Sequence, residues 1–233
     1  MSGVNMNYEG EDNLELMKLA QNYNKSLVAL IVKNKPPKAK DILDFGSGDG
    51  WFAREVAASL KQDVICVEPA QNMLKYYEKP PLTSLEQCET QSVDFVYSLN
   101  VLEHIEDDAR IIDEFYRVLR KNGELLLYLP AFPCLYSSMD KHVGHYRRYK
   151  RSDVKRLFDT AKWQVEKICY ADSLGWFASL VFKFSGNDSG VPSVRMLKLY
   201  DSVFYPISLG LDKLFGKFLG KNIVIRMMKR GEE

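Results

Sequence analysis

Three glycines alternate with other residues directly after a short apolar run, in the stretch "DILDFGSGDGWFAREVA" at 41–57. A strand, a glycine loop and a helix in this order present backbone N–H groups at the start of the helix, and glycine lets a ligand approach without a β-carbon in the way. Gly46, Gly48 and Gly50 therefore predict a site for a ligand that comes close to the backbone. The alternative is a glycine-rich turn that binds nothing.

Two acidic residues narrow the choice of ligand. Asp44 adds a carboxylate at the tip of the first strand, which would repel a diphosphate and suit an amino or sulfonium cation. Glu68 follows the apolar run "VICV" and ends the second predicted strand, where a carboxylate can accept both hydroxyls of a ribose. Together they predict a nucleoside ligand, and a lone surface glutamate is the alternative for Glu68.

The glycine spacing disfavours a dinucleotide. The dinucleotide fingerprint is G-x-G-x-x-G, whereas this chain has G-x-G-x-G, followed by Trp51 where a small residue should let the helix pack on the strand. Trp51 and Asp44 therefore argue against a nicotinamide oxidoreductase.

A second polar group falls in "LPAFPCLYSSMDKHVGHYRRYKRSDV" at 129–154, which leaves the predicted sheet on the ligand side. His145 is our candidate base or substrate-orienting group, because histidine is the side chain best suited to take a proton from a hydroxyl near neutral pH. Two adjacent arginines suit an anionic acceptor group, since a guanidinium matches two oxygens at once. The candidate substrate contacts are Tyr136, His142, Tyr146, Arg147 and Arg148.

Structural roles are the alternative for the same stretch. His145 can hydrogen-bond the loop, and either arginine can pair with Asp140 or Asp153. His104 is expected to orient its own loop rather than act as a base. Asp140, His142 and His145 form a D-x-H-x-x-H pattern, but the loop offers no further carboxylate or cysteine partner, so we predict no metal site.

Short apolar runs alternate with amphipathic segments, which predicts a parallel sheet with helices on both faces. Strands are predicted at 41–45, 63–67, 93–98, 124–130 and 164–170, and helices at 51–60, 70–77, 107–120 and 152–160. Ser152 and Asp153 are the candidate caps of the last helix. An apolar run at 222–228 would close the sheet as an edge strand. Before the sheet, apolar residues at helical spacing predict one or two helices that end at Pro36 and Pro37.

The bulk composition sets further limits. The chain has 233 residues, 46% of them hydrophobic, and 32 Lys and Arg against 31 Asp and Glu give a net charge of +1. This length favours one domain, and the charge balance provides no global attraction to nucleic acid or membrane. The cysteines are far apart, with no C-x-x-C pair and no signal peptide before them, so we expect reduced core thiols in a cytoplasmic protein. They are Cys66, Cys88, Cys134 and Cys169.

The segment 173–220 is rich in Trp, Phe, Tyr and Leu and is too long for a turn between strands, so we predict a helical cap. Charged residues interrupt its apolar runs, which argues against a membrane span. Three roles stay open: a lid over the acceptor pocket, a dimer surface, or an interfacial membrane contact. The basic residues that would help a membrane contact are Lys213, Lys217, Lys221 and Arg226.

Four blocks between Asp41 and Ala131 resemble the class I S-adenosylmethionine-dependent methyltransferases. They are "ILDFGSGDG", "VICVEPA", "SVDFVYSLNVLEHI" and "RVLRKNGELLLYLPA", in order and at compatible spacing. The "LEHI" spelling is similar to that of the small-molecule branch of the family. The resemblance implies an α/β fold: a doubly wound, Rossmann-like, mostly parallel sheet with an antiparallel last strand, helices on both faces and a helical cap before the last strand.

We expect one methyltransferase domain over 1–233. Its parts would be a helical lead-in (1–38), a Rossmann-like core (39–172), the cap insertion (173–220) and a last strand with its tail (221–233). Families of this type often fold the leading helix over the donor, so Tyr8, Tyr23 and Asn24 are expected to close the cofactor side.

The resemblance also implies which residues bind S-adenosylmethionine. Asp44 and the three glycines would cradle the methionine part, Glu68 would take the ribose hydroxyls, and Asn100 with the loop through His104 would lie beside the sulfonium. The remaining expected cofactor contacts are Ser47, Pro69 and Val101.

The adenine contacts are expected in a shortened region. Only twenty-five residues separate Glu68 from Asp94, fewer than the family usually gives to a helix and a third strand, so that strand is expected to be very short. Within "PPLTSLEQCETQ", Ser84 or Leu85 is the expected neighbour of the adenine.

We therefore predict an enzyme that moves a methyl group from S-adenosylmethionine to an oxygen of a small-molecule or lipid-like acceptor. The stretch D-x-x-x-G-H-x-R-R-Y is similar to one in bacterial-type methyltransferases thought to act on sugars, polyketide-like metabolites or lipid-linked intermediates. A scaffold that binds the donor and transfers nothing is the alternative. Nucleic-acid methylation is disfavoured by the charge balance and by "NVLE" after the fourth strand, which lacks the proline-rich loop of enzymes that methylate nucleic-acid amino groups. Peripheral membrane association and a homodimer stay open.

Overall fold

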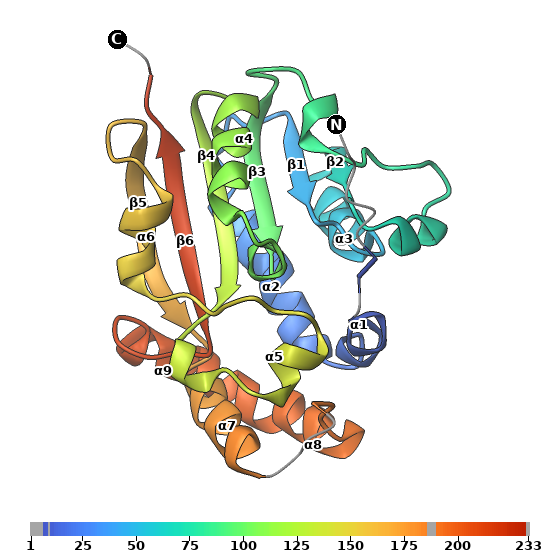
Figure 1. Cartoon of the computed structure of the whole chain (residues 1–233), viewed down its shortest axis with the longest axis vertical. Coiled ribbons are helices and arrows are strands. Elements are labelled where there is room, and N and C mark those ends of the chain that lie inside the picture. Colours follow the sequence, from blue (N-terminus) through green and yellow to red (C-terminus); the bar gives the residue numbers. More distant parts are fainter. Residues whose placement is uncertain (1–6, 9, 186–189, 232–233) are drawn as a thin grey trace.

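A six-stranded sheet forms the centre of the computed structural model, which describes residues 7–8, 10–185 and 190–231 (Figure 1). The strand order is β2-β1-β3-β4-β6-β5, and among these strands only β6 runs antiparallel to its neighbours. The strands are β1 (Ile42–Phe45), β2 (Val64–Val67), β3 (Val93–Leu99), β4 (Leu119–Pro130), β5 (Trp163–Ala171) and β6 (Asn222–Lys229). The predicted fold class is confirmed.

Helices cover both faces of this sheet (Figure 1). They are α1 (Glu11–Met17), α2 (Gln21–Asn34), α3 (Trp51–Leu60), α4 (Asp108–Val118), α5 (Ser138–His142), α6 (Arg151–Leu157), α7 (Ser173–Phe184), α8 (Val194–Leu199) and α9 (Tyr205–Phe215). Leu27 and Ile31 of α2 pack with Ile42 on one face, whereas Phe115 of α4 packs with Leu43 on the other. Burying a side chain of this size contributes roughly 1.5–3 kcal/mol.

The prediction that 222–228 forms an edge strand is wrong. β6 lies between β4 and β5 and pairs with both, and Ile223, Val224 and Ile225 are buried. A continuous apolar run is typical of a strand covered on both faces. The edge strand on this side of the sheet is β5, where Val165 is exposed.

Two helix predictions also need correction. α6 begins at Arg151 with Lys150 as its N-cap residue, and the Lys150 N–H donates to the Asp153 carboxylate at 2.9 Å, so Ser152 is not the cap. The segment predicted as a helix at 70–77 forms a 3₁₀ helix over Gln71–Tyr76.

The shortened third strand is reduced to a single bridge. Leu82 pairs with Val67, its N–H donates to the Cys66 carbonyl at 3.0 Å, and its carbonyl accepts from the Glu68 N–H at 2.8 Å. The expectation of a very short strand is confirmed.

The cysteines carry free thiols, but the expectation that they are core residues holds only for Cys88. Cys134 is exposed, while Cys66 and Cys169 are partly buried. Cys134 belongs to a 3₁₀ turn, Pro133–Leu135, that follows β4 on the outside of the sheet.

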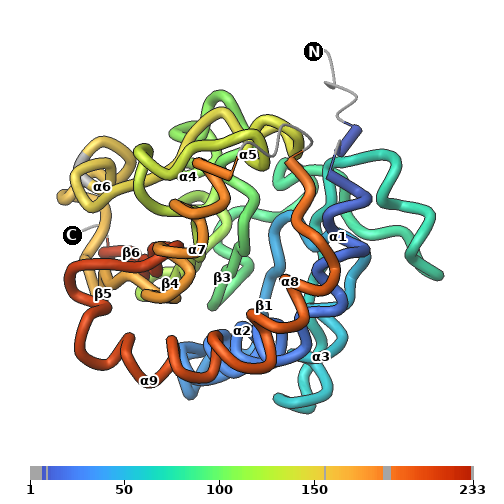
Figure 2. Tube along the Cα trace, turned by 90° about the horizontal axis from the view of Figure 1, so that it is seen from below, coloured from blue at the N-terminus to red at the C-terminus, as the bar shows by residue number. Residues whose placement is uncertain are grey.

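The described parts of the helical cap, residues 173–185 and 190–220, lie beyond the carboxyl ends of the parallel strands (Figures 1 and 2). The Asp201 carboxylate accepts from the N–H groups of Asn22 and Tyr23 at 3.0 and 2.9 Å, which caps the start of α2. The Asp212 carboxylate accepts from the N–H groups of Asp172 and Ser173 at 2.7 and 2.8 Å, at the start of α7. These bonds fix the cap to the core. No described helix is both long and apolar enough to cross a bilayer.

Candidate active site

The glycine loop takes a backbone conformation that only glycine adopts easily. Gly46, Gly48 and Gly50 have φ values of 73°, 59° and 74°. A β-carbon at Gly46 would lie 2.3 Å from a methyl group of Val101, so this glycine permits close packing against the neighbouring loop. At Gly48 the nearest atom to an added β-carbon is Leu14 Cδ2 at 3.9 Å. Gly48 therefore presents open backbone to the space in front of the loop.

Glu68 lies opposite this loop at the end of β2. Its Oε2 accepts from the Gly48 N–H at 2.6 Å and its Oε1 accepts from the Ala70 N–H at 2.8 Å. Burial raises the pKa of Glu68, while these two backbone hydrogen bonds act in the opposite direction. The carboxylate is thus held in a fixed orientation at the tip of its strand, where it can accept ribose hydroxyls.

Asp44 lies behind the loop rather than in front of it. Its side chain is buried, its Oδ2 has no hydrogen-bond partner, and burial raises its pKa to about 8. Neither Asp44 nor Gly50 lines the cavity described below. Asp44 is therefore not positioned for direct contact with a ligand cation in the cavity.

One large cavity joins the glycine loop to the cap. Its volume is about 1710 Å³, which exceeds the roughly 300–1,000 Å³ of a pocket for one small ligand. The predicted cofactor contacts that line it are Gly46, Ser47, Gly48, Glu68, Pro69, Asn100, Val101 and His104. The cavity has room for a donor and an acceptor together.

The N-terminal segment closes the loop end of the cavity. Tyr8, Tyr23 and Asn24 line it as expected. The Tyr8 N–H donates to Asn72 Oδ1 at 2.9 Å, and the Tyr8 ring meets the His104 ring edge-on with 5.3 Å between centroids. The segment before α1 and the loop that carries His104 thus form one wall of the cavity.

The adenine prediction does not agree with the structure. Ser84 and Leu85 do not line the cavity. The Ser84 hydroxyl instead accepts from the Glu86 N–H at 3.1 Å as the cap of a 3₁₀ helix, and Leu85 is buried in the core.

Asp140 is the centre of the loop between β4 and α6. Its carboxylate is fully buried and accepts from Arg148 Nε at 2.7 Å and from a second Arg148 nitrogen at 3.0 Å. It also binds His145 Nδ1 at 2.8 Å and accepts from the Ser137 N–H at 2.9 Å. Burial alone would raise the pKa of Asp140, but the bonds from His145 and Arg148 hold it well below its usual range. The structural alternative considered for Arg148 is therefore observed.

The substrate contacts predicted in this loop divide into two groups. His145, Tyr146 and Arg148 line the cavity. Tyr136, His142 and Arg147 do not line the cavity, and each binds another group of the protein. The Tyr136 hydroxyl donates to the His145 carbonyl at 2.6 Å, His142 Nε2 binds the Asp12 carboxylate at 2.9 Å, and Arg147 pairs with the Asp108 carboxylate at 3.0 Å. The anion-binding prediction fails for Arg147, because its charge is already paired outside the cavity, and for Arg148, because Asp140 occupies its guanidinium.

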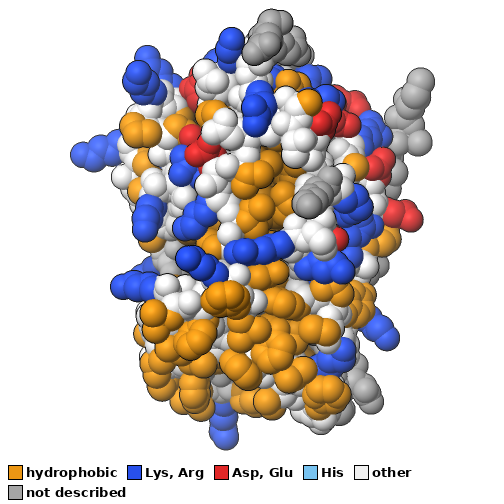
Figure 3. Space-filling view, turned by 90° about the vertical axis from the view of Figure 1, so that its left-hand side faces the viewer, with side chains coloured by type: hydrophobic (Ala, Val, Ile, Leu, Met, Phe, Trp, Pro, Cys, Tyr) orange, Lys and Arg blue, Asp and Glu red, His pale blue; other side chains and the backbone are white. Residues whose placement is uncertain are grey.

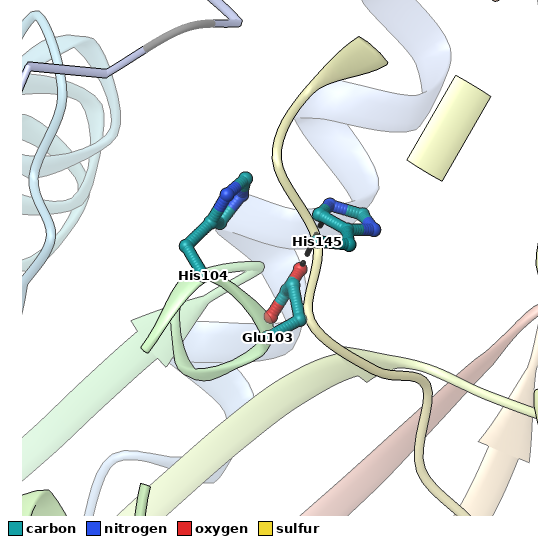
Figure 4. Close-up of side chains that lie close together, drawn as sticks. All are labelled: Glu103, His104 and His145. Carbon is teal, nitrogen blue, oxygen red and sulfur yellow. Dashed lines mark ion pairs between the residues drawn. The ribbon is translucent and has the colours of Figure 1, made fainter. Parts of the chain in front are cut away.

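Glu103, His104 and His145 meet at the cavity wall (Figure 4). Glu103 is fully buried, neither of its carboxylate oxygens has a hydrogen-bond partner, and burial raises its pKa to about 8. Its Oε1 lies 3.8 Å from His145 Nε2. Burial lowers the pKa of His104 to about 3, and the neighbouring His145 adds to this effect. His104 is therefore a neutral ring, in keeping with an orienting role.

These three residues form the one group among the described His, Cys, Asp and Glu side chains whose ligand atoms, all within 4.8 Å of one another, could hold a metal ion. It differs from the set weighed in the sequence, because Asp140 is bound by Arg148 and His142 is turned to Asp12.

The polar residues of the cavity that sequence reasoning did not single out include Glu103, Lys221 and Asn222. Burial lowers the pKa of Lys221, and the Asn222 amide donates to Asn100 Oδ1 at 3.3 Å. A signal was present for the last two. An antiparallel strand begins at the edge where its parallel neighbours end, so the first residues of β6 had to lie on the ligand side.

Comparison with known proteins finds similarity to methyltransferases. Residues 43–127 match a family model described as a methyltransferase domain. A Mycolicibacterium smegmatis protein named "Probable S-adenosylmethionine-dependent methyltransferase" is 27% identical over 148 residues, which are 59% of this chain and 55% of that protein. The chain thus spans about half the length of this curated relative.

Solved structures share the fold over most of the chain. A "SAM-dependent methyltransferase" from Thermotoga maritima has a TM-score of 0.60 at 19% identity, over 94% of this chain and 96% of the other. Haemonchus contortus phosphoethanolamine N-methyltransferase 2, in complex with phosphomonomethylethanolamine and S-adenosylhomocysteine, has a TM-score of 0.56 at 17% identity, over 90% of this chain and 53% of the other. The family match over 43–127 includes the glycine loop and reaches from β1 into β4. With the named relative and the shared fold, it supports a class I S-adenosylmethionine-dependent methyltransferase domain.

Proposed function

We propose that this chain transfers the methyl group of S-adenosylmethionine to an oxygen of a small-molecule acceptor. The observation that carries the proposal is the continuous cavity, which has the glycine loop and Glu68 at one end and His145 on its wall. The bound donor supplies an activated methyl carbon, so the protein's task is to bring the acceptor oxygen into line with it. A base is needed because a hydroxyl acceptor must lose its proton.

Residues of the chain fit the donor at the loop end. Glu68 would hold the ribose hydroxyls, and Gly46, Ser47 and Gly48 would face the methionine part. Asn100, Val101, His104 and Pro69 would complete its walls. Two observations support this assignment. All of these residues line the cavity, and Gly48 has no side chain that would fill the space in front of the loop.

His145 is placed to take the acceptor proton. Asp140 is an ionised carboxylate that also receives Arg148, so His145 Nδ1 donates to it and Nε2 is left as the acceptor nitrogen. Asp140 would stabilise the imidazolium as it forms, and Asp140 and Arg148 are thus positioning residues. The apolar cap side chains would exclude water from the transfer.

The donor part is tested by isothermal titration with S-adenosylmethionine and S-adenosylhomocysteine. We expect both to bind the purified protein. A folded protein that binds neither would overturn the methyltransferase proposal.

The acceptor part is tested by incubating the protein and methyl-labelled donor with organic-solvent and aqueous extracts of cells that express it. We expect labelled product with the wild type, roughly 10²–10⁴-fold slower transfer with His145→Gln, and no change with His142→Gln, which alters a histidine outside the cavity. Donor binding without any labelled product would instead favour a protein that binds the donor and transfers nothing. Transfer lost on adding EDTA and restored by Zn²⁺ would contradict the role of His145 as base and favour a metal held by Glu103, His104 and His145.

A further inference from the structure

The cap exposes apolar side chains over one end of the molecule (Figure 3). Phe184 and Phe218 are 76% and 74% exposed. We call the exposed large hydrophobic residues of α7, α8, α9 and the turn after α9 the apolar face. Its most exposed members are Val181, Phe184, Met196, Leu214 and Phe218. A contiguous surface of this kind marks an interaction site rather than ordinary protein surface.

The charges around the apolar face have one sign. Among the described residues of 173–220, every exposed charged side chain is basic: Lys183, Arg195, Lys198, Lys213 and Lys217. The two acidic residues described there point inward, since Asp201 caps α2 and Asp212 binds the start of α7. The net charge of +1 hides this separation. An apolar surface with a basic border complements an anionic lipid surface.

The cavity opens within the apolar face. Phe177, Val181, Met196 and Leu199 are exposed and also line the cavity. The described apolar side chains of α7 and α8 thus continue from the apolar face into the wall of the cavity. The loop end and the apolar face are two ends of the same space.

We propose that the apolar face docks on an anionic membrane surface and that the cavity takes an acceptor with an apolar tail from that membrane. The acceptor part rests on the proposed methyl transfer, whereas the docking does not. A second copy of the chain is the less suitable occupant, because a symmetric contact would bring the five basic side chains of one copy against those of the other. That occupant is an outcome of the test.

Vesicle flotation tests the docking. The full chain is mixed with vesicles of phosphatidylcholine alone or of phosphatidylcholine with phosphatidylglycerol. We expect it to float with the anionic vesicles, less at high salt, and at least about tenfold more weakly after Lys213→Glu/Lys217→Glu. Leu214→Ser/Phe218→Ser should weaken binding to the anionic vesicles too. None of these four residues lines the cavity, so donor binding by titration should be unchanged.

Matched controls lie at the opposite edge of the sheet. Lys38→Glu/Lys40→Glu changes the same number of charges before β1, and Val165→Ser removes an exposed apolar side chain from β5. Both should float like the wild type. A wild type that binds the donor but no vesicles, or that forms a dimer which Leu214→Ser/Phe218→Ser splits, would overturn the docking. Vesicle binding without donor binding would leave the docking in place and overturn the methyl transfer.

The acceptor part has its own readout. A series of phenols with alkyl tails of increasing length is offered with labelled donor and anionic vesicles. Transfer that rises with tail length, and that Lys213→Glu/Lys217→Glu reduces only when vesicles are present, supports the proposal. Equal transfer to all tail lengths would overturn it.

Discussion

At the glycine-loop end of the cavity, a buried carboxylate is hydrogen-bonded to backbone N–H groups, whereas at the cap end apolar side chains are exposed to solvent. Glu68 accepts hydrogen bonds from two backbone N–H groups within 2.8 Å. Three positions of the neighbouring loop have positive φ values that favour glycine. Phe184 and Leu214 are 76% and 70% exposed. The glycine-loop end is therefore built to hold one ligand in a fixed geometry, whereas the cap end offers an extended apolar surface. A substitution should therefore act sharply at the first end and in small steps at the second.

The largest effect is expected at Gly48. Gly48→Arg would place a long side chain in the open space where only Leu14 is near, so donor binding should fall below detection by isothermal titration. Gly210→Arg is the matched control, because nothing lies within 4 Å of a β-carbon added there. Similar loss of donor binding in both variants would break the contrast between the two ends.

Asp140→Asn should be the most destabilising change. The buried Arg148 guanidinium would lose its partner, which costs about 3–5 kcal/mol in the free energy of unfolding, measured by urea denaturation. Because the folded-state pKa of Asp140 is lowered, its contribution is present above the unfolded value of about 3.9 and is lost as the pH falls below it. The variant should therefore lose less stability than the wild type in acid. Asp113→Asn, at an exposed residue, should have little effect, and a loss below about 1 kcal/mol in Asp140→Asn would contradict the central role of this carboxylate.

A smaller effect on donor affinity is expected from Glu68→Gln. The amide keeps the shape but has only one accepting oxygen and no charge, so two backbone N–H groups and the ribose compete for it. Hydrogen bonds to charged groups contribute about 1.5–3 kcal/mol, which corresponds to donor binding weakened about 10–150-fold by titration. Glu86→Gln, on an exposed carboxylate paired with Arg110, should bind the donor like the wild type. Unchanged affinity in Glu68→Gln would remove the ribose assignment.

The same contrast explains what the sequence could predict. The sequence predicted the strand, loop and helix around Gly46 and the acidic end of β2. These features depend on residues that are close together in the chain, so the spacing of residue types reveals them. The position of β6 depends on pairing with β4, and even the pair that is nearest in sequence, Pro130 with Asn222, is 92 residues apart along the chain. No local pattern encodes contacts that are so distant. Arg147 could not be assigned, because its partner Asp108 belongs to a distant part of the chain. The pairing of Arg148 with Asp140, a residue of the same loop, was one of the alternatives that the sequence offered.

The last prediction concerns Glu103, which lies between the two ends. Both of its carboxylate oxygens are buried without a hydrogen-bond partner, and burial raises its pKa to about 8. A raised folded-state pKa means that stability is greatest below the unfolded value of about 4.3, decreases as the pH rises, and levels off above about 8. Unfolding free energies measured across this range should show a shallower decline in Glu103→Gln than in the wild type. An unchanged decline would mean that Glu103 is already ionised in the folded protein. A cation held together with His104 and His145 would produce that result, and the His145 side chain would then serve the site as a ligand rather than as a base.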